Sequence, residues 1–153
     1  MSAATERRTT ARVVPVNRGG HVLLLFGCDP MRPESPYWFT IGGAIETGET
    51  LEEAGARELF EETSIEVSPR QLVAPYARGR HDFSWGGREI SNDSHFFAVR
   101  VDDVTVSFDH LDGLEVGSIF EARWWDRAEL TEAPLSNPDL PAMAAAAVAA
   151  VTA

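Results

Sequence analysis

Acidic side chains crowd one short segment of the chain, between Gly43 and Ile65. A single arginine, Arg57, lies among its glutamates, which are Glu46, Glu49, Glu52, Glu53, Glu58, Glu61 and Glu62. Like charges at helical spacing repel each other, so such a cluster lowers stability unless a counter-charge compensates it. Hard divalent cations such as Mg²⁺ prefer carboxylate oxygens and often bind substrate phosphates as well. The segment therefore predicts a metal site.

Helical spacing brings three of these carboxylates together. Glu58, Glu61 and Glu62 stand at positions i, i+3 and i+4, so they project from one face of a helix. That face also carries Leu51 and Ala54, whereas a solvated acidic face would lie opposite the apolar residues. Small and apolar neighbours favour the wall of a cleft. An ordinary exposed acidic helix is the alternative.

The spacing resembles the signature of the Nudix hydrolases, which is Gly, five residues, Glu, seven residues, then Arg-Glu-apolar-x-Glu-Glu-x-Gly-apolar. The chain matches it at Gly43, Glu49, Arg57, Glu58, Leu59, Glu61, Glu62 and Ile65. Ser64 replaces the last Gly of the signature. The run of residues 38–43 and the Arg-Trp-Trp run at 123–125 also resemble the flanking parts of that family.

The resemblance implies an α/β fold, the Nudix-type α/β/α sandwich with a mixed β-sheet. It also implies a hydrolase that uses Mg²⁺ or Mn²⁺ to cleave the diphosphate linkage of a nucleoside diphosphate joined to another group. The metal ligands carried over from the family are Glu58, Glu61 and Glu62, with a backbone carbonyl near Gly43. The partner is then a small nucleotide-type diphosphate. A non-catalytic nucleotide-binding or regulatory domain is the alternative.

Further roles follow from the resemblance. The family pairs the arginine of the signature with its first glutamate, so we expect Arg57 to contact Glu49. Glu58, Glu61 and Arg57 are thus expected to serve catalysis. In many members a glutamate outside the signature activates water.

Two acids are candidates for this general base. Glu121 precedes the Arg-Trp-Trp run and is the first candidate, and Glu115 is the second. Either residue could instead be an exposed loop acid, and the glutamates of the signature could serve in their place.

Substrate contacts are weakly encoded in the sequence. Arg78, Arg80, His81 and Arg88 lie near Trp85 in the chain and could form a platform for phosphate and base. Arginine matches phosphate geometry, and aromatic rings stack on bases. The alternative is a set of scattered surface arginines with a core tryptophan.

Composition narrows the function classes. The chain has 153 residues, 44% of them hydrophobic, and a formal net charge of −11. That charge disfavours general binding to nucleic acid or to anionic membranes. The chain has no lysine, which excludes a Schiff-base lysine and a Gly-Lys-Ser/Thr phosphate loop. Cys28 is the single cysteine, so no intramolecular disulfide can form, and we expect a cytoplasmic location.

The surrounding elements must position these residues. We expect a flexible lead at residues 1–9 and one domain over residues 10–153. Strands are predicted at 11–16, 21–26, 37–41, 71–76, 95–101 and 122–125, with a weaker candidate at 104–108. A helix should begin after Thr50, with Glu53 completing a capping box, and end near Ser64. A second helix is predicted at 138–151. Homodimers are common in the family, and the sequence indicates no interface.

Overall fold

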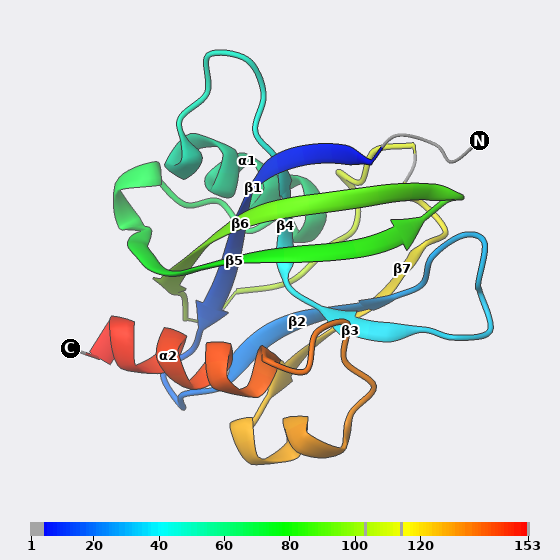
Figure 1. The fold of residues 1–153 in the computed structure, drawn as a ribbon. Coiled ribbons are helices and arrows are strands. Elements are labelled where there is room, and N and C mark those ends of the chain that lie inside the picture. Colours follow the sequence, from blue (N-terminus) through cyan, green and yellow to red (C-terminus); the bar gives the residue numbers. More distant parts are fainter. Residues whose placement is uncertain (1–4, 103, 114, 153) are drawn as a thin grey trace.

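The computed structural model describes residues 5–102, 104–113 and 115–152, and it consists of a mixed sheet with helices (Figure 1). The strands are β1 (Glu6–Val16), β2 (Val22–Gly27), β3 (Tyr37–Phe39), β4 (Ile41–Ala44), β5 (Val73–Trp85), β6 (Arg88–Arg100) and β7 (Ile119–Trp125). The helices are α1 (Leu51–Thr63) and α2 (Leu140–Thr152), with 3₁₀ turns η1 (Pro69–Gln71) and η2 (Arg127–Glu132).

The sheet follows the order β3-β2-β1-β6-β5, with β4 paired to β1 and β7 paired to β2. β1 and β6 are parallel, and the other pairs are antiparallel. The predicted mixed sheet is therefore confirmed. The turn at residues 17–20 joins β1 to β2, which meet only at Val16 and Val22.

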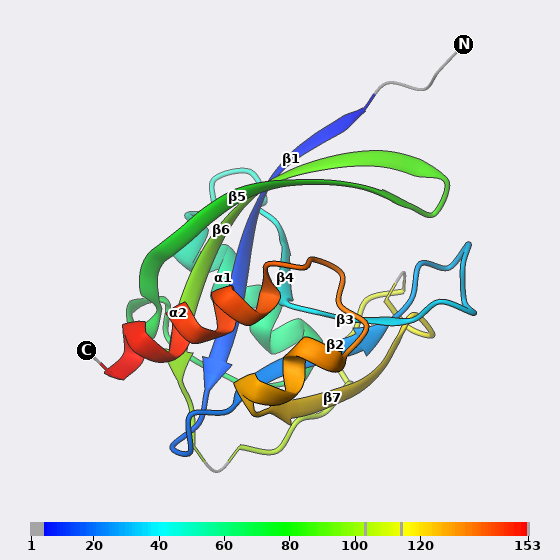
Figure 2. The ribbon, with the colours of Figure 1, turned by 60° about the horizontal axis from the view of Figure 1, so that its bottom comes forward.

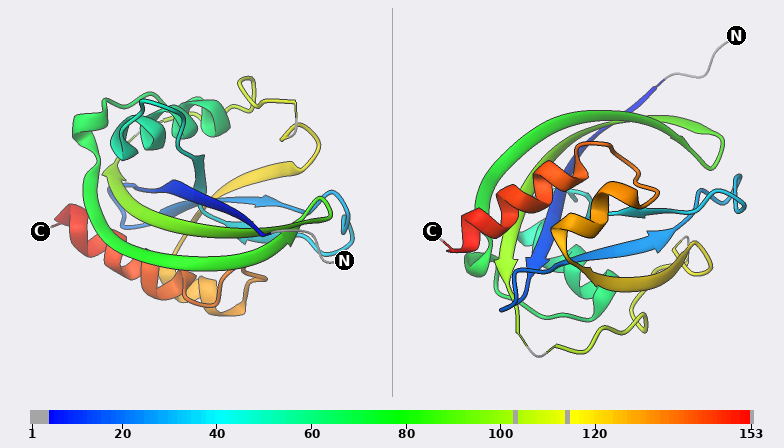
Figure 3. Two further views of the ribbon diagram at one scale, coloured as in Figure 1. Left: turned by 45° about the horizontal axis from the view of Figure 1, so that its top comes forward. Right: turned by 90° about the horizontal axis from the view of Figure 1, so that it is seen from below.

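Alternate residues of the central strands feed two separate cores. On β1, Ala11 and Val13 pack towards α1, whereas Val14 and Val16 pack towards α2 and η2. This alternation follows from the two-residue period of a strand. Figure 3 shows α1 on one side of the strands and α2 on the other. The predicted α/β/α arrangement is confirmed. Among the described residues, no helix is both long and apolar enough to span a membrane.

Both ends of α1 form as the sequence predicts. The Thr50 hydroxyl accepts a hydrogen bond from the Glu53 amide, and the Glu53 carboxylate accepts one from the Thr50 amide. The helix ends at Ser64, whose φ of 64° and ψ of 13° place it in the left-handed region that the family fills with glycine.

The expectation of a loosely held lead up to Thr9 is wrong for the residues that the structure describes. β1 begins at Glu6, and its first residues pair in parallel with β6, from Glu6 opposite Ile90 to Thr9 opposite Asp93. The lead becomes a strand because β6 is much longer than predicted and offers it a partner. Residues 1–4 lie outside the described part.

The β5–β6 hairpin is the largest departure from the sequence prediction. Instead of strands at 71–76 and 95–101, β5 runs to Trp85 and β6 begins at Arg88. The two strands turn at Gly86 and Gly87, and the mixture of polar and aromatic side chains on either side gives no strand pattern in the sequence. Figure 2 shows the hairpin as a long, curved ribbon. The weak strand candidate at 104–108 has no strand in its described residues, and the second predicted helix is α2.

Candidate active site

The acidic helix meets β4 at two glycines. The Gly42 amide donates a 2.8 Å hydrogen bond to Oε1 of Glu62. At Gly43 an added Cβ would lie 2.6 Å from Oε1 of Glu58, so a larger residue there would displace the Glu58 carboxylate. β4 thus fixes two of the signature glutamates at the edge of the sheet.

A third carboxylate reaches the same place from a distant loop. Ligand oxygens of Glu58, Glu62 and Glu115 all lie within 4.8 Å of one another, and we call these residues the carboxylate cluster. Burial raises the pKa of Glu62 well above its usual range, and the nearby Glu115 and Glu58 add to that shift. Burial also raises the pKa of Glu58 to about 7 and that of Glu115 above its usual range. Each of the three is therefore costly to ionise without a counter-charge.

The carboxylate cluster has the kind of ligands that a hard cation requires. Glu62 is only 2% exposed. Its neighbours in the cluster are acids. Within the cluster Arg57 donates to Glu58 at 2.9 Å, and the Arg12 guanidinium lies close enough to Glu62 for the two charges to interact. Three carboxylates in one partly buried place suit a cation that prefers oxygen ligands.

Arg57 joins the helix to the preceding loop. Its Nε and one terminal nitrogen donate to the two carboxylate oxygens of Glu49 at 2.8 and 3.0 Å, and a further bond reaches the Ala44 carbonyl at 3.1 Å. The contact that the resemblance implied between Arg57 and Glu49 is present. The hydrogen bond from Arg57 lowers the pKa of Glu49 below its usual value.

Glu61 is placed differently from the other two helix acids. Its carboxylate lies 3.3 Å from Arg57 and its side chain is 32% exposed. Among the described residues, the carboxylate cluster contains Glu58 and Glu62 but not Glu61. Glu58 and Glu62, four residues apart, lie one above the other on the helix, whereas Glu61 is rotated towards Arg57 and solvent.

The two candidates for the general base lie apart. Glu121 is exposed on β7, opposite Phe26 of β2, and does not line the cleft beside the cluster. Glu115 lines that cleft and belongs to the cluster. The structure thus places the second candidate, Glu115, beside Glu58 and Glu62 and leaves the first, Glu121, outside the cleft.

A cleft of about 310 Å³ extends from the carboxylate cluster along the sheet. One wall is the β5–β6 hairpin, which contributes His81, Phe83 and Trp85. The rings of His81 and Phe83 are stacked, with centroids 5.2 Å apart. Tyr37 and Phe39 add aromatic surface from β3. The cleft therefore has an acidic end and an aromatic wall.

Two arginines of β1 line the same cleft. Arg12 donates to the carbonyls of Thr40 and Gly42, at 3.2 and 2.9 Å, and Arg8 donates to Oδ1 of Asn92 at 3.0 Å. Burial lowers the pKa of both guanidinium groups, and for Arg8 the neighbouring Arg12 adds to the effect. Their hydrogen-bonded partners are neutral oxygens, and the nearby carboxylates of Glu62 and Glu58 partly offset the effect of burial on the pKa of Arg12. A bound anion would stabilise both charges further.

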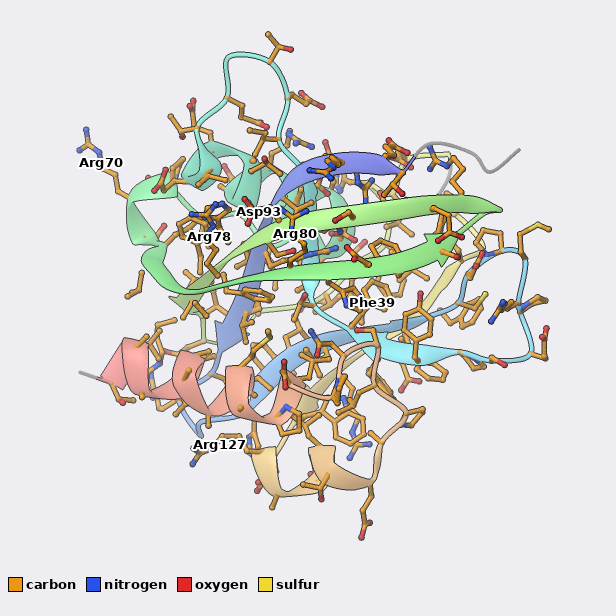
Figure 4. All side chains as sticks on the ribbon, viewed as in Figure 1. Phe39, Arg70, Arg78, Arg80, Asp93 and Arg127 are labelled. Carbon is orange, nitrogen blue, oxygen red and sulfur yellow. The ribbon has the colours of Figure 1, made fainter. Side chains whose placement is uncertain are left out.

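Arg78 and Arg80 do not line this cleft. They alternate along β5 with the cleft residues and therefore point from the opposite face of the strand. Arg78 forms a two-pronged bond with Asp93 of β6, at 3.1 and 2.8 Å, and Arg80 donates to Ser91. Figure 4 shows Arg78, Arg80 and Asp93 gathered over the two strands. Of the residues predicted to form the platform, His81, Trp85 and Arg88 line the cleft.

Sequence reasoning missed Arg8, Arg12 and Phe83. The available signal was alternation: Arg8 and Arg12 are four residues apart on a strand, and so share a face. His81 and Phe83 alternate with Trp85 in the same way. Neither pattern identifies the site without the pairing of β1, β6 and β5.

Comparison with known proteins agrees with this geometry. The NUDIX domain family model matches residues 6–146, so the chain belongs to the NUDIX family.

Two relatives carry names that describe RNA substrates. The RNA pyrophosphohydrolase of Erythrobacter litoralis is 33% identical over 102 residues, which cover 61% of this chain and 60% of that protein. The NAD-capped RNA hydrolase NudC of Haemophilus influenzae is 40% identical over 55 residues, 36% of this chain and 21% of that protein. The chain thus spans about a fifth of the length of the second relative.

A solved structure supports the fold alone. The NUDIX domain of Shewanella oneidensis NrtR, complexed with ADP ribose, has a TM-score of 0.67 with 17% sequence identity. The likeness covers 98% of this chain and 90% of that chain.

Proposed function

We propose that this protein is a divalent-metal-dependent hydrolase that cleaves the diphosphate linkage of a nucleoside diphosphate joined to another group. The observation that carries the proposal is the carboxylate cluster of Glu58, Glu62 and Glu115 at one end of a cleft that also contains Arg8 and Arg12. A cleft with a cluster of acids and two arginines suits a substrate that is itself polyanionic and is bound with a cation.

The cluster would hold Mg²⁺ or Mn²⁺. Such a cation neutralises phosphate oxygens and stabilises the charge that develops when a diphosphate is hydrolysed. Glu58, Glu62 and Glu115 supply the carboxylates. Glu61 and the Gly43 carbonyl stay proposed ligands from the family resemblance. Arg57 holds Glu58 and Glu49 in place and so acts through them.

The remaining cleft residues would bind the rest of the substrate. Arg8 and Arg12 carry buried positive charge that a phosphate group can neutralise. The rings of His81, Phe83 and Trp85 offer stacking surface for a base or another planar group. This arrangement supports a substrate that joins phosphates to an aromatic moiety.

Glu115 is our choice of proton acceptor for the attacking water, in place of Glu121. It lies beside Glu58 and Glu62 in the cleft, whereas Glu121 is exposed on β7.

The substrate could be a small nucleotide or the 5′ end of an RNA. The net charge of −11 favours a small molecule, whereas the names of the two relatives favour RNA ends. We propose the small molecule and include RNA in the test. A cytoplasmic location and a homodimer remain predictions of the sequence and of the family resemblance.

A hydrolysis screen with and without Mg²⁺ or Mn²⁺ tests the proposal. The panel contains nucleoside triphosphates, oxidised deoxynucleotides, ADP-ribose, NADH, nucleotide sugars, dinucleoside polyphosphates and 5′-triphosphate RNA. Glu62→Gln should lose turnover, and Glu66→Gln, which changes an exposed glutamate outside the cleft, should keep it. No turnover of any compound with either cation would contradict a hydrolase of this substrate class.

A binding domain without catalysis is the second candidate. It is favoured by the structural likeness to the NrtR NUDIX domain, which was solved with ADP ribose. Calorimetry with ADP-ribose separates the two functions: tight binding without cleavage in the presence of either cation supports the binding domain, and cleavage excludes it.

A further inference from the structure

Ser64 has an unusual backbone conformation. It is the only residue other than glycine with a positive φ in the described part of the chain. A side chain in the left-handed region is strained, because its Cβ approaches the neighbouring carbonyl. The Nudix signature has glycine here, so some other contact must favour serine.

The Ser64 hydroxyl attaches a distant loop to the end of α1. It donates to the Ser107 carbonyl at 3.0 Å and lies 2.9 Å from Nδ1 of His110. The Ser107 amide in turn donates to the Thr63 carbonyl at 2.9 Å. The ring of His110 also packs on Phe60, with centroids 4.4 Å apart.

This loop delivers Glu115 to the carboxylate cluster. Glu115 lies in a turn in which its amide bonds to Asp112, and the Ile119 amide, where β7 starts, bonds to the Glu115 carbonyl. The segment 107–118 is not part of any strand in its described residues. Glu115 is therefore fixed between two anchors, which are β7 on one side and the end of α1 on the other.

The same helix carries the other two members of the cluster, Glu58 and Glu62. We propose that the Ser64 hydroxyl is a positioning group, which ties the loop to α1 and so keeps Glu115 beside Glu58 and Glu62. This inference rests on the proposed role of the cluster in cation binding. A glycine at position 64 would relax the backbone but remove both contacts of the hydroxyl, which leaves the bond between the Ser107 amide and the Thr63 carbonyl as the link to the end of α1.

The test compares Ser64→Gly, Glu115→Gln and the double variant with the wild-type protein. Ser68→Gly is the control, because Ser68 is also a serine beyond α1 but is exposed and bonds only within the η1 turn. Calorimetry measures Mn²⁺ affinity, thermal unfolding measures stability, and hydrogen exchange measures the protection of the amides in residues 107–118.

We expect Ser64→Gly to unfold close to the wild-type temperature, since the strain that glycine removes offsets the hydrogen bonds that it loses. Its Mn²⁺ affinity should nevertheless fall by roughly tenfold, the usual scale for losing a group that orients a metal ligand. In the Glu115→Gln background the same change should alter affinity by less than about twofold, since the ligand that Ser64 positions is already gone. Exchange in the loop should accelerate in Ser64→Gly and not in Ser68→Gly.

Two results would overturn the inference. One is unchanged loop exchange in Ser64→Gly, and the other is an equal loss of Mn²⁺ affinity with and without Glu115. If the wild-type protein binds no Mn²⁺, the proposed function fails instead. Loop exchange then still decides whether Ser64 positions the Glu115 loop.

Discussion

The Gly86 amide donates a 2.9 Å hydrogen bond to Oδ1 of Asp29, and this bond joins the tip of the β5–β6 hairpin to the loop after β2. The same oxygen accepts a bond from the Met31 amide at 2.9 Å. Asp29 is 6% exposed. One buried carboxylate therefore holds the tip of the hairpin, next to Trp85, over the cleft.

Asp29→Ala should loosen this hairpin. Two amides lose a charged acceptor, so we expect the free energy of unfolding to fall by about 1–3 kcal/mol. Because Trp85 lines the cleft, KM should rise more than kcat falls, which steady-state kinetics on the substrate found in the screen would measure. Asp29→Asn keeps an acceptor oxygen and is the matched control. A loss confined to kcat would argue against a role of the hairpin in binding.

Glu62→Gln should stabilise the metal-free protein and abolish its response to Mg²⁺. The amide removes a buried charge that lies beside Glu58 and Glu115, while its oxygen can still accept the bond from Gly42. Thermal unfolding in EDTA and in Mg²⁺ measures both effects. We expect turnover to fall at least about a hundredfold, in line with the loss of a metal-ligand interaction. A Mg²⁺-dependent rise in Tm that survives in this variant would remove Glu62 from the ligand set.

The metal-free protein should lose stability as the pH rises from about 5 to about 7. Burial raises the pKa of Glu58 from the usual 4.5 to about 7 in the folded state. The folded state thus binds the proton more tightly than the unfolded chain, and this contribution, at most about 3 kcal/mol, disappears as Glu58 ionises.

Denaturant titrations at several pH values, in EDTA and in Mg²⁺, measure this dependence. Mg²⁺ should flatten the curve, because the cation compensates the ionised cluster. The Glu58→Gln protein should show a weaker dependence in EDTA, since its amide does not titrate. A stability that rises over the same interval in EDTA would contradict the assignment.

Arg57→Lys should reduce turnover even though it preserves the charge. Lysine cannot reproduce the two parallel bonds to Glu49 together with those to Ala44 and Glu58. We expect kcat to fall by about 10- to 100-fold, with a smaller change in KM, and steady-state kinetics can separate the two. Arg70→Lys, at an exposed arginine on η1, should leave both unchanged. A change in KM alone would mean that Arg57 contacts substrate.

The helix and its caps were predictable because their determinants are local. Thr50 and Glu53 form a capping box three residues apart, and Glu58 and Glu62 stand four residues apart on the same helix. Glu115 could not be chosen over Glu121 in this way. Its place depends on a loop that is anchored by Ser64, more than fifty residues earlier in the chain.

The β5–β6 hairpin shows the other limit of prediction. Its strands continue through polar residues because each finds a partner, as Arg80 does opposite Asp93 and His81 opposite Asn92. A single-strand pattern carries no information about such partners. Without these partners, the sequence groups Arg78 and Arg80 with His81, although only His81 of the three lines the cleft.

Both faces of β1 are buried, so the register of this strand decides which side chains reach the cleft as well as which ones pack in the cores. Insertion of a single residue between Thr9 and Arg12 would turn the preceding part of the strand over relative to the rest. Arg8 would then leave the cleft for the face of α1, and a neighbour such as Thr9 would take its place. The acidic segment between Gly43 and Ile65 would be unchanged, yet one of the two β1 arginines would be lost from the cleft. Length changes in this strand, whether engineered or natural, should therefore alter which substrates the cleft binds while leaving the carboxylate cluster in place.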